Sequence, residues 1–218
     1  MQCVKALVSF FTIVPAKGPL DFRCAWALPY VVPPITALPP ALLLAAGASP
    51  LLAYALLLLM TGLNHLDGLA DVADALMVRD RERARAVLED PRRGTAGIFA
   101  AVAAFVIPAF HLASPWQLVF AEVYSKALTV TFAGRSTAFK KGLGDVFIEA
   151  TRRRWPLALP ALALAAYADP IAFLAATAAS AAFYLAAYRH LGGANGDVFG
   201  YLLEVSRASY ITAAYYFK

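Results

Sequence analysis

The sequence of 218 residues contains little charge and little cysteine. Asp, Glu, Lys and Arg make up 15% of it, whereas hydrophobic residues make up 61%. Soluble domains carry about 25% charged residues, so this composition excludes an ordinary soluble domain and is typical of a bundle of membrane-spanning helices. The two cysteines, Cys3 and Cys24, are too few for a disulfide framework or a zinc knuckle, and we interpret both as small apolar residues.

Two further features are missing. No small-residue cleavage motif follows the apolar start MQCVKALVSFFTIVPAKG, which favours an uncleaved amphipathic or re-entrant segment over a signal peptide. The net charge of +5 comes from two basic blocks, RDRERARAVLEDPRR and KKGLGDVFIEATRRR, without the aromatic–basic alternation of single-strand-binding proteins. We therefore expect a lipid bilayer as the partner of this chain, and no nucleic acid.

The apolar segments predict an all-α fold, a polytopic integral membrane helix bundle that forms one domain over residues 1–218. Several segments are shorter than the roughly 20 residues of a full crossing, so tilted, half or merged spans are expected. Five prolines between residues 29 and 40 predict that the first span is kinked and buried in the bundle. The six to seven expected spans lie near residues 25–47, 51–66, 96–113, 115–134, 155–168, 170–188 and 201–217.

The loops between these spans are of two kinds. Those at 47–50, 113–115 and 167–170 are short and lack Lys and Arg, whereas the long loops 67–95 and 135–154 hold most of the basic residues. The positive-inside rule makes the side with the long loops cytoplasmic. On that face MVRDRERARAVLEDP predicts an amphipathic helix, with its apolar residues toward the membrane or bundle and its arginines toward lipid headgroups or an anionic ligand.

Three carboxylates, Asp67, Asp71 and Asp74, directly follow the apolar run LLAYALLLLM and are spaced i, i+4, i+7. On a continuous helix they share one face and repel one another unless a positive group lies among them. A hard cation such as Mg²⁺ takes carboxylate oxygens and commonly bridges to substrate phosphates. A solvated helix start is the simpler alternative, but it explains three acids beside a membrane span poorly. We therefore interpret all three as metal ligands, and His65 as a ligand, a proton shuttle or a structural hydrogen-bonding group.

Two later stretches add groups suited to phosphate. In EDPRRGTAG, residues 89–97, Arg92 and Arg93 offer bidentate contacts, and the glycines let the backbone approach an anion where a span begins, although ordinary helix capping also uses such residues. In LGGANGDVFGYLLE, residues 191–204, a glycine-rich loop returns Asp197 and Glu204 to the same predicted side. A metal site and a phosphate clamp on one face suggest phosphoryl-group transfer.

The strings HLDGLADVAD, DPRRGTAG and NGDVFGYLLE, in this order, resemble the membrane-bound cobalamin synthases, also called adenosylcobinamide-GDP ribazoletransferases. The resemblance covers essentially the whole chain, and its first string is the most specific. It departs from the family at Asn195, where Thr is usual, at Asn64, where an aromatic is common, and at Phe139, where a basic residue is frequent. The last departure leaves the roles of Lys140 and Lys141 open. The resemblance carries over His65, Asp67, Gly68, Asp71 and Asp74, then Asp90, Arg92, Gly94, Thr95 and Gly97, and finally Gly196 and Asp197.

The resemblance implies Mg²⁺-dependent transfer of the adenosylcobinamide phosphoryl group from adenosylcobinamide-GDP to α-ribazole or its 5′-phosphate, with release of GMP. Asp67, Asp71 and Asp74 would hold the metal at the diphosphate, and Arg92 would stabilise charge on the leaving GMP. The 5′-hydroxyl of ribazole would attack after losing its proton to His65 or Asp197. The expected catalytic residues are thus His65, Asp67, Asp71, Asp74 and Asp197, and the expected substrate-binding residues are Asp90, Arg92, Arg93, Gly94, Thr95, Gly97 and Gly196.

Two other functions compete with this interpretation. A CDP-alcohol phosphatidyltransferase also places acids at a membrane face, but its D-G-x-x-A-R signature differs from DGLADVAD at Asp71. A cation-coupled transporter usually buries such acids near the bilayer midplane, whereas these lie at the predicted end of a span. The sequence does not decide the oligomeric state, and a homo-oligomer is compatible with it.

Overall fold

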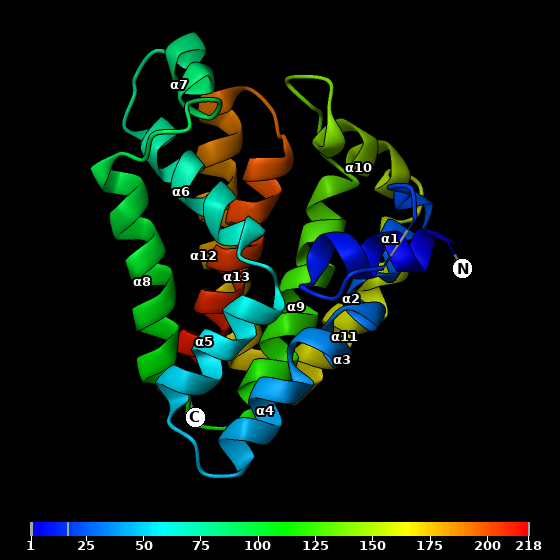
Figure 1. The fold of residues 1–218 in the computed structure, drawn as a ribbon, viewed down its shortest axis with the longest axis vertical. Helices are drawn as coiled ribbons and strands as arrows, with labels where there is room; N and C mark the ends of the chain where they lie inside the picture. Colours follow the sequence, from blue (N-terminus) through cyan, green and yellow to red (C-terminus); the bar gives the residue numbers. More distant parts are fainter. Residues whose placement is uncertain (1, 17, 218) are drawn as a thin grey trace.

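The structure is a computed structural model that describes residues 2–16 and 18–217. Within these residues the secondary structure is helical apart from one bridge between Ala138 and Ala194, which confirms the all-α prediction (Figure 1). In chain order the helices are α1 (Gln2–Phe11), the 3-10 helix η1 (Phe22–Ala27), α2 (Leu28–Val31), α3 (Pro33–Thr36), α4 (Leu38–Ala45), α5 (Pro50–Met60), α6 (Asn64–Leu76), α7 (Arg81–Val87), α8 (Thr95–His111), α9 (Pro115–Ala133), α10 (Leu143–Thr151), the 3-10 helix η2 (Trp155–Ala158), α11 (Leu159–Ala168), α12 (Pro170–Leu191) and α13 (Gly196–Tyr216).

One helix, α12, is long and apolar enough to cross a bilayer by itself. Two bent pairs also qualify when each is taken as one broken span, namely Phe22–Val31 with Pro33–Ala45, bent by 48°, and α5 with α6, bent by 93°. The described residues therefore contain one to three candidate spans by length and composition, fewer than the six to seven that the sequence predicts. Helix α8 is shorter than a full crossing, and α9 and α13 carry charged residues within their apolar length.

The proline-rich segment is kinked, as its sequence predicts. It forms a series of short helices, η1 to α4, because proline lacks the N–H that would continue each one. Pro29, Pro33 and Pro40 are buried, whereas Pro34 and Pro39 are exposed. The segment packs against α9 through α2, α3 and α4. The prediction that this segment is buried in the bundle is thus confirmed only for the side that faces α9.

The first helix joins this segment through a disulfide between Cys3 and Cys24, whose Cα atoms lie 5.5 Å apart. Our interpretation of both cysteines as unpaired apolar residues was therefore wrong. The argument from their number addressed a framework of several bridges, and it did not exclude one bridge between two elements that pack together. Helix α1 has 10 residues, buries Ala6, Leu7 and Phe11, and lies across the long helices instead of along them (Figure 1).

The basic segments gather at one end of the molecule, where α7 and α10 lie (the upper end in Figure 1). Helix α7 is the predicted amphipathic helix, with Ala84 buried and Leu88 buried directly after it. Its arginines, however, do more than face headgroups. Arg81 donates to the carbonyls of Arg189 and His190, and Arg85 donates to the carbonyl of Leu191 at 2.8 Å. Because the last carbonyls of a helix lack intrahelical partners, these arginines fasten α7 to the end of α12.

A cluster of four fully buried charged side chains joins α9 to α13. Glu122 accepts hydrogen bonds from Lys126 and Arg207, each at 2.6 Å, and Arg207 also donates to Glu204 at 2.6 Å. The two positive and two negative charges compensate one another, as buried charges require. Glu204 therefore belongs to the interior of the bundle, two turns below Asp197 on α13, and not to the surface on which the sequence had placed it.

We predict that Glu122→Gln lowers the free energy of unfolding by about 3–5 kcal/mol, because it leaves two buried cations facing one carboxylate. Thermal unfolding of purified protein in detergent, followed by tryptophan fluorescence, would measure the loss. The control is Glu149→Gln, which breaks an exposed pair with Arg152 and should change stability by less than about 1 kcal/mol. Equal midpoints for the two variants would contradict this role of the cluster.

Candidate active site

Helix α6 carries all three predicted metal ligands, so the expectation that they share one helix is confirmed. The chain leaves α5 through Gly62 and Leu63, whose φ angles of 74° and 62° are left-handed. This turn ends α5 and bends the chain by 93°. The acids therefore do not continue the apolar helix before them, as a span over 51–66 implied. They begin a separate helix that runs toward the basic end of the molecule (Figure 1).

Helix α6 lies directly against α13 because two glycines face the contact. A Cβ on Gly68 would lie 2.9 Å from the carbonyl oxygen of Asp197, and a Cβ on Gly200 would lie 3.2 Å from that of His65. Real side chains do not fit at the first of these distances. The two backbones thus touch where Asp197 begins α13, and Asp197 stands beside the α6 turn that carries Asp67 and Asp71.

The positive group among the acids is Arg93. One of its terminal nitrogens, Nη1, donates to Oδ1 of Asp71, and the other, Nη2, donates to Oδ1 of Asp67. The Asp71 side chain is 9% exposed and that of Asp67 is 61% exposed. A planar guanidinium can bridge two carboxylates in this way, whereas an ammonium cannot match the geometry.

Asp74 is held differently from the other two acids. Its carboxylate oxygens accept hydrogen bonds from the backbone N–H of Gly94 at 2.7 Å and of Gly97 at 2.8 Å, at the start of α8. A Cβ on either glycine would collide with this carboxylate. The backbone of the GTAG stretch therefore does approach an anion at a helix start, as predicted, but that anion is the side chain of Asp74.

Arg92 and Asp90 form an exposed pair away from the acids. Arg92 donates to both oxygens of Asp90, at 3.0 and 2.7 Å, and these side-chain hydrogen bonds lower the pKa of Asp90 to about 2. Lys140 pairs with the neighbouring Glu89 at 2.9 Å. Thr95 is exposed as the first residue of α8. Of the two adjacent arginines, Arg93 thus contacts the acids of α6, whereas the sequence favoured Arg92.

Asn195 is a site residue that the sequence reasoning missed. Its Oδ1 accepts the N–H of Val198 and caps α13, and its Nδ2 donates to Oδ2 of Asp197 at 2.6 Å. The signal was present, since Asn is a favoured first residue at helix starts. We considered Asn195 only as a departure from the family's Thr, yet it orients the carboxylate that follows it.

The carboxylate oxygens are of the type that binds a hard cation, but in this structure they are not arranged around a common point. Within the described part of the chain no three His, Cys, Asp or Glu side chains are gathered closely enough to hold a metal ion. Arg93 and the amides of α8 occupy the positions between them. Arg93 uses only Oδ1 of Asp67 and Asp71, so Oδ2 of each accepts no hydrogen bond from the residues described here. Such oxygens are the ligands that Mg²⁺ prefers.

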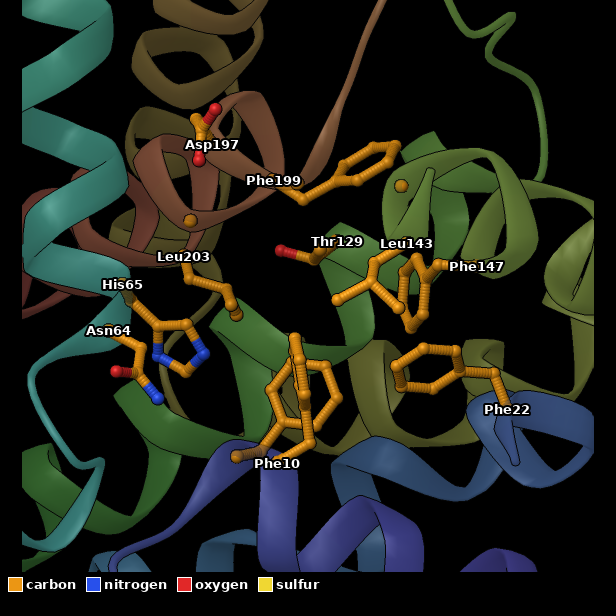
Figure 2. A pocket seen from close by; sticks show the side chains of 14 residues that line it. Phe10, Phe22, Asn64, His65, Thr129, Leu143, Phe147, Asp197, Phe199 and Leu203 are labelled. Atoms are coloured by element: carbon orange, nitrogen blue, oxygen red, sulfur yellow. The ribbon is translucent and has the colours of Figure 1, made fainter. Parts of the chain in front are cut away.

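A cavity of about 230 Å³ is lined by residues of α1, η1, α6, α9, α10 and α13 and is shown in Figure 2. His65 and the hydroxyl of Thr129 point into it, and neither finds a hydrogen-bond partner among the described residues. His65 therefore contacts a pocket and not the acid cluster. Its ring lies 5.4 Å from that of Phe11. Asp197 and Gly196 also line the cavity, so it is joined to the acids at the start of α13. The remaining lining residues are Phe10, Phe11, Phe22, Asn64, Leu143, Gly144, Phe147, Phe199, Gly200 and Leu203.

Known proteins resemble the chain over nearly its full length. The family model described as Cobalamin-5-phosphate synthase matches residues 4–215. An "Adenosylcobinamide-GDP ribazoletransferase" of Pyrobaculum calidifontis is 68% identical, covering 97% of this chain and 98% of the relative, and one of Pyrobaculum aerophilum is 60% identical, covering 97% and 95%. A protein of the same name from Thermoplasma acidophilum is 30% identical, covering 97% and 90%. No solved structure matches the chain. The chain therefore belongs to the cobalamin-5-phosphate synthase family.

Proposed function

We propose that this chain is an adenosylcobinamide-GDP ribazoletransferase of cobalamin biosynthesis. It transfers the adenosylcobinamide phosphoryl group to a free ribose hydroxyl of α-ribazole or of its 5′-phosphate, and releases GMP. Because the 5′-phosphate has no free 5′-hydroxyl, a hydroxyl that serves both acceptors is not the one at the 5′ position. The observation that carries the proposal is the full-length similarity to relatives of that name. The acids of α6, bridged by Arg93 and joined by Asp197, supply groups that suit the chemistry.

The enzyme acts as one integral membrane domain with six to seven spans, some of them broken or short, and its site opens to the cytoplasm. Two observations support this topology, and the positive-inside rule gives its orientation. The basic segments and α6 lie toward one end, and the α4–α5 and α8–α9 links lie at the other (Figure 1). Large apolar side chains such as Phe99, Phe110 and Leu174 are 73%, 77% and 67% exposed, as lipid-facing residues are. The basic end is cytoplasmic by the positive-inside rule.

Asp67, Asp71 and Asp74 are the residues that would hold Mg²⁺. When bound, this ion would neutralise charge on the diphosphate and on the departing GMP. Asp67 and Asp71 each offer an uncommitted Oδ2. Asp74 keeps lone pairs beyond the two that accept the α8 amides, because a carboxylate has about four acceptor positions. Its present bonds also fix the start of α8 beside the other two acids.

Arg93 has two tasks in this proposal. With no substrate bound it neutralises the repelling pair Asp67 and Asp71. When other positive charge compensates these carboxylates, Arg93 can exchange them for phosphate oxygens, to which its planar fork is equally suited. Arg92 and Asp90 lie in the exposed loop next to it, where they can contact the nucleotide, and Thr95 and Gly97 set the α8 end of the same surface.

Asp197 is the base that the geometry favours for the acceptor hydroxyl. It lines the cavity and also lies at the α6–α13 contact, between the pocket and the acids. Asn195 donates to only one of its oxygens, which leaves the other for a substrate proton. His65 is the alternative base, and in that role His65→Gln would lower kcat without changing KM for α-ribazole.

We predict that Asp71→Asn lowers the rate of GMP release about 1,000-fold, because an amide keeps the shape of the side chain but removes the charge that binds the metal and Arg93. The assay uses purified protein, adenosylcobinamide-GDP, α-ribazole and saturating Mg²⁺. Glu149→Gln, an exposed change on α10, is the control and should keep the normal rate. Near-normal turnover by a correctly folded Asp71→Asn variant would refute the role of this carboxylate.

The two arginines can be ranked by a second pair of variants. We predict that Arg93→Lys lowers kcat/KM for adenosylcobinamide-GDP about 100-fold, because the single ammonium of lysine lacks the planar fork whose two terminal nitrogens each bind one anion. Arg92→Lys should have a clearly smaller effect, because among the described residues the Arg92 side chain forms hydrogen bonds only with Asp90. Steady-state GMP release measures both. A larger loss for Arg92→Lys would restore the order that the sequence favoured.

A further inference from the structure

We propose that the cavity in Figure 2 binds the base of the acceptor, the dimethylbenzimidazole ring of α-ribazole. This inference rests on the proposed function and adds to it the place where one substrate lies. It assigns hydrogen bonding to His65 and Thr129, and stacking to phenylalanines from four separate elements.

The walls of the cavity are suited to a flat aromatic ring. Phe10, Phe22, Phe147 and Phe199 come from α1, η1, α10 and α13 and surround the space (Figure 2). The ring centroids of Phe10 and Phe22 are 5.3 Å apart, those of Phe22 and Phe147 are 5.8 Å apart, and both pairs meet edge to face. Rings in such pairs present faces and edges to which another aromatic ring can add.

The size of the cavity selects among the parts of the two substrates. Its volume of about 230 Å³ is below the roughly 300–1,000 Å³ of sites for drug-sized ligands. A fused bicyclic ring fits such a space, whereas a corrinoid or a whole nucleotide does not. Three bicyclic bases therefore remain, the benzimidazole of the acceptor and the guanine and adenine of the donor.

The polar atoms of the cavity favour the benzimidazole. His65 is 5% exposed and Thr129 is fully buried, yet both ring nitrogens of His65 and the hydroxyl of Thr129 lack partners among the described residues. Buried polar groups in native proteins are nearly always paired, so a ligand is expected to complete them. Benzimidazole joined to ribose keeps one acceptor nitrogen, to which the Thr129 hydroxyl or a His65 N–H can donate. Guanine and adenine both bring donors and acceptors on several edges, and most of these would face phenylalanine.

The position of the cavity also orients the acceptor for attack. Gly196 and Asp197 form part of its lining, and a Cβ on Gly196 would meet no atom within 4 Å, so there is free space at this point. A base held among the phenylalanines would place its ribose at Gly196 and the accepting ribose hydroxyl near Asp197. From there the hydroxyl faces the α6 acids, where the diphosphate would lie. Two substrates would thus meet at the start of α13.

The test is Thr129→Val, which keeps the volume of the side chain and removes its hydroxyl. We expect KM for α-ribazole to rise about tenfold, with little change in kcat or in KM for adenosylcobinamide-GDP. The fold should tolerate the change, because the hydroxyl has no protein partner to lose. Thr212→Val is the matched control, since its hydroxyl is also buried and unpaired but lies outside this cavity. It should leave both KM values unchanged.

An altered acceptor tests the same contact from the other side. The indole counterpart of α-ribazole has CH in place of the acceptor nitrogen, and it should bind wild-type protein and Thr129→Val equally weakly. His65→Gln should likewise raise KM for α-ribazole. A fall in kcat at unchanged KM would instead make His65 the base and remove it from this proposal.

Binding of α-ribazole alone to the purified protein in detergent, measured by calorimetry, separates this inference from the proposed function. If wild-type protein releases no GMP with any acceptor but binds α-ribazole in a manner weakened by Thr129→Val, the proposed function fails and the pocket assignment stands. If GMP is released normally and Thr129→Val and Phe147→Leu alter only KM for adenosylcobinamide-GDP, the cavity holds a base of the donor and the assignment is overturned. Unchanged values for both substrates in both variants would overturn it as well.

Discussion

The site depends on the direct contact between the backbones of α6 and α13. Gly68 and Gly200 make this contact, and any side chain at Gly68 would meet the carbonyl of Asp197. The approach brings Asp197, from residues near the end of the chain, beside Asp67 and Asp71 from its first third. The aromatic cavity lies beside the same contact, because His65, Asp197 and Gly200 also line it. Gly68 is therefore part of the acidic motif for a geometric reason, because the acids on either side of it need α13 within reach.

The sequence predicted best the features that depend on residues close together in the chain, such as those on one face of a single helix. The spacing of Asp67, Asp71 and Asp74 places them on one helix, and the charge pattern of residues 77–91 gives the amphipathic helix α7, since both depend only on 3.6 residues per turn. The alternation of basic and neutral loops likewise anticipates which segments share an end of the molecule. Each of these inferences uses neighbours in sequence, and no knowledge of which helices pack together is needed.

The features that sequence could not predict depend on such packing. Nothing in the dipeptide RR indicates that Arg93 reaches α6 while Arg92 folds back on Asp90. The bend after α5 comes from a left-handed Leu63, a conformation that leucine rarely adopts and that composition does not signal. Cys3 and Cys24 meet only because α1 lies across η1, and Glu204 is internal only because Arg207 and Glu122 face it. In each instance the partner lies far away in sequence or on another face of the same helix.

The balance of charge separates structural from functional clusters in this apolar protein. Glu122 and Glu204 meet Lys126 and Arg207, so the buried group between α9 and α13 is neutral and needs no ligand to compensate it. At the α6–α13 contact, by contrast, the described residues place one cation, Arg93, against Asp67 and Asp71, and give the Asp197 side chain the Asn195 amide as its hydrogen-bond donor. An excess of negative charge next to a bilayer is costly unless something positive arrives to balance it. The fold tolerates this imbalance because the Asp67 side chain is 61% exposed to solvent. The same excess of negative charge leaves the cluster able to bind a cation together with an anionic substrate.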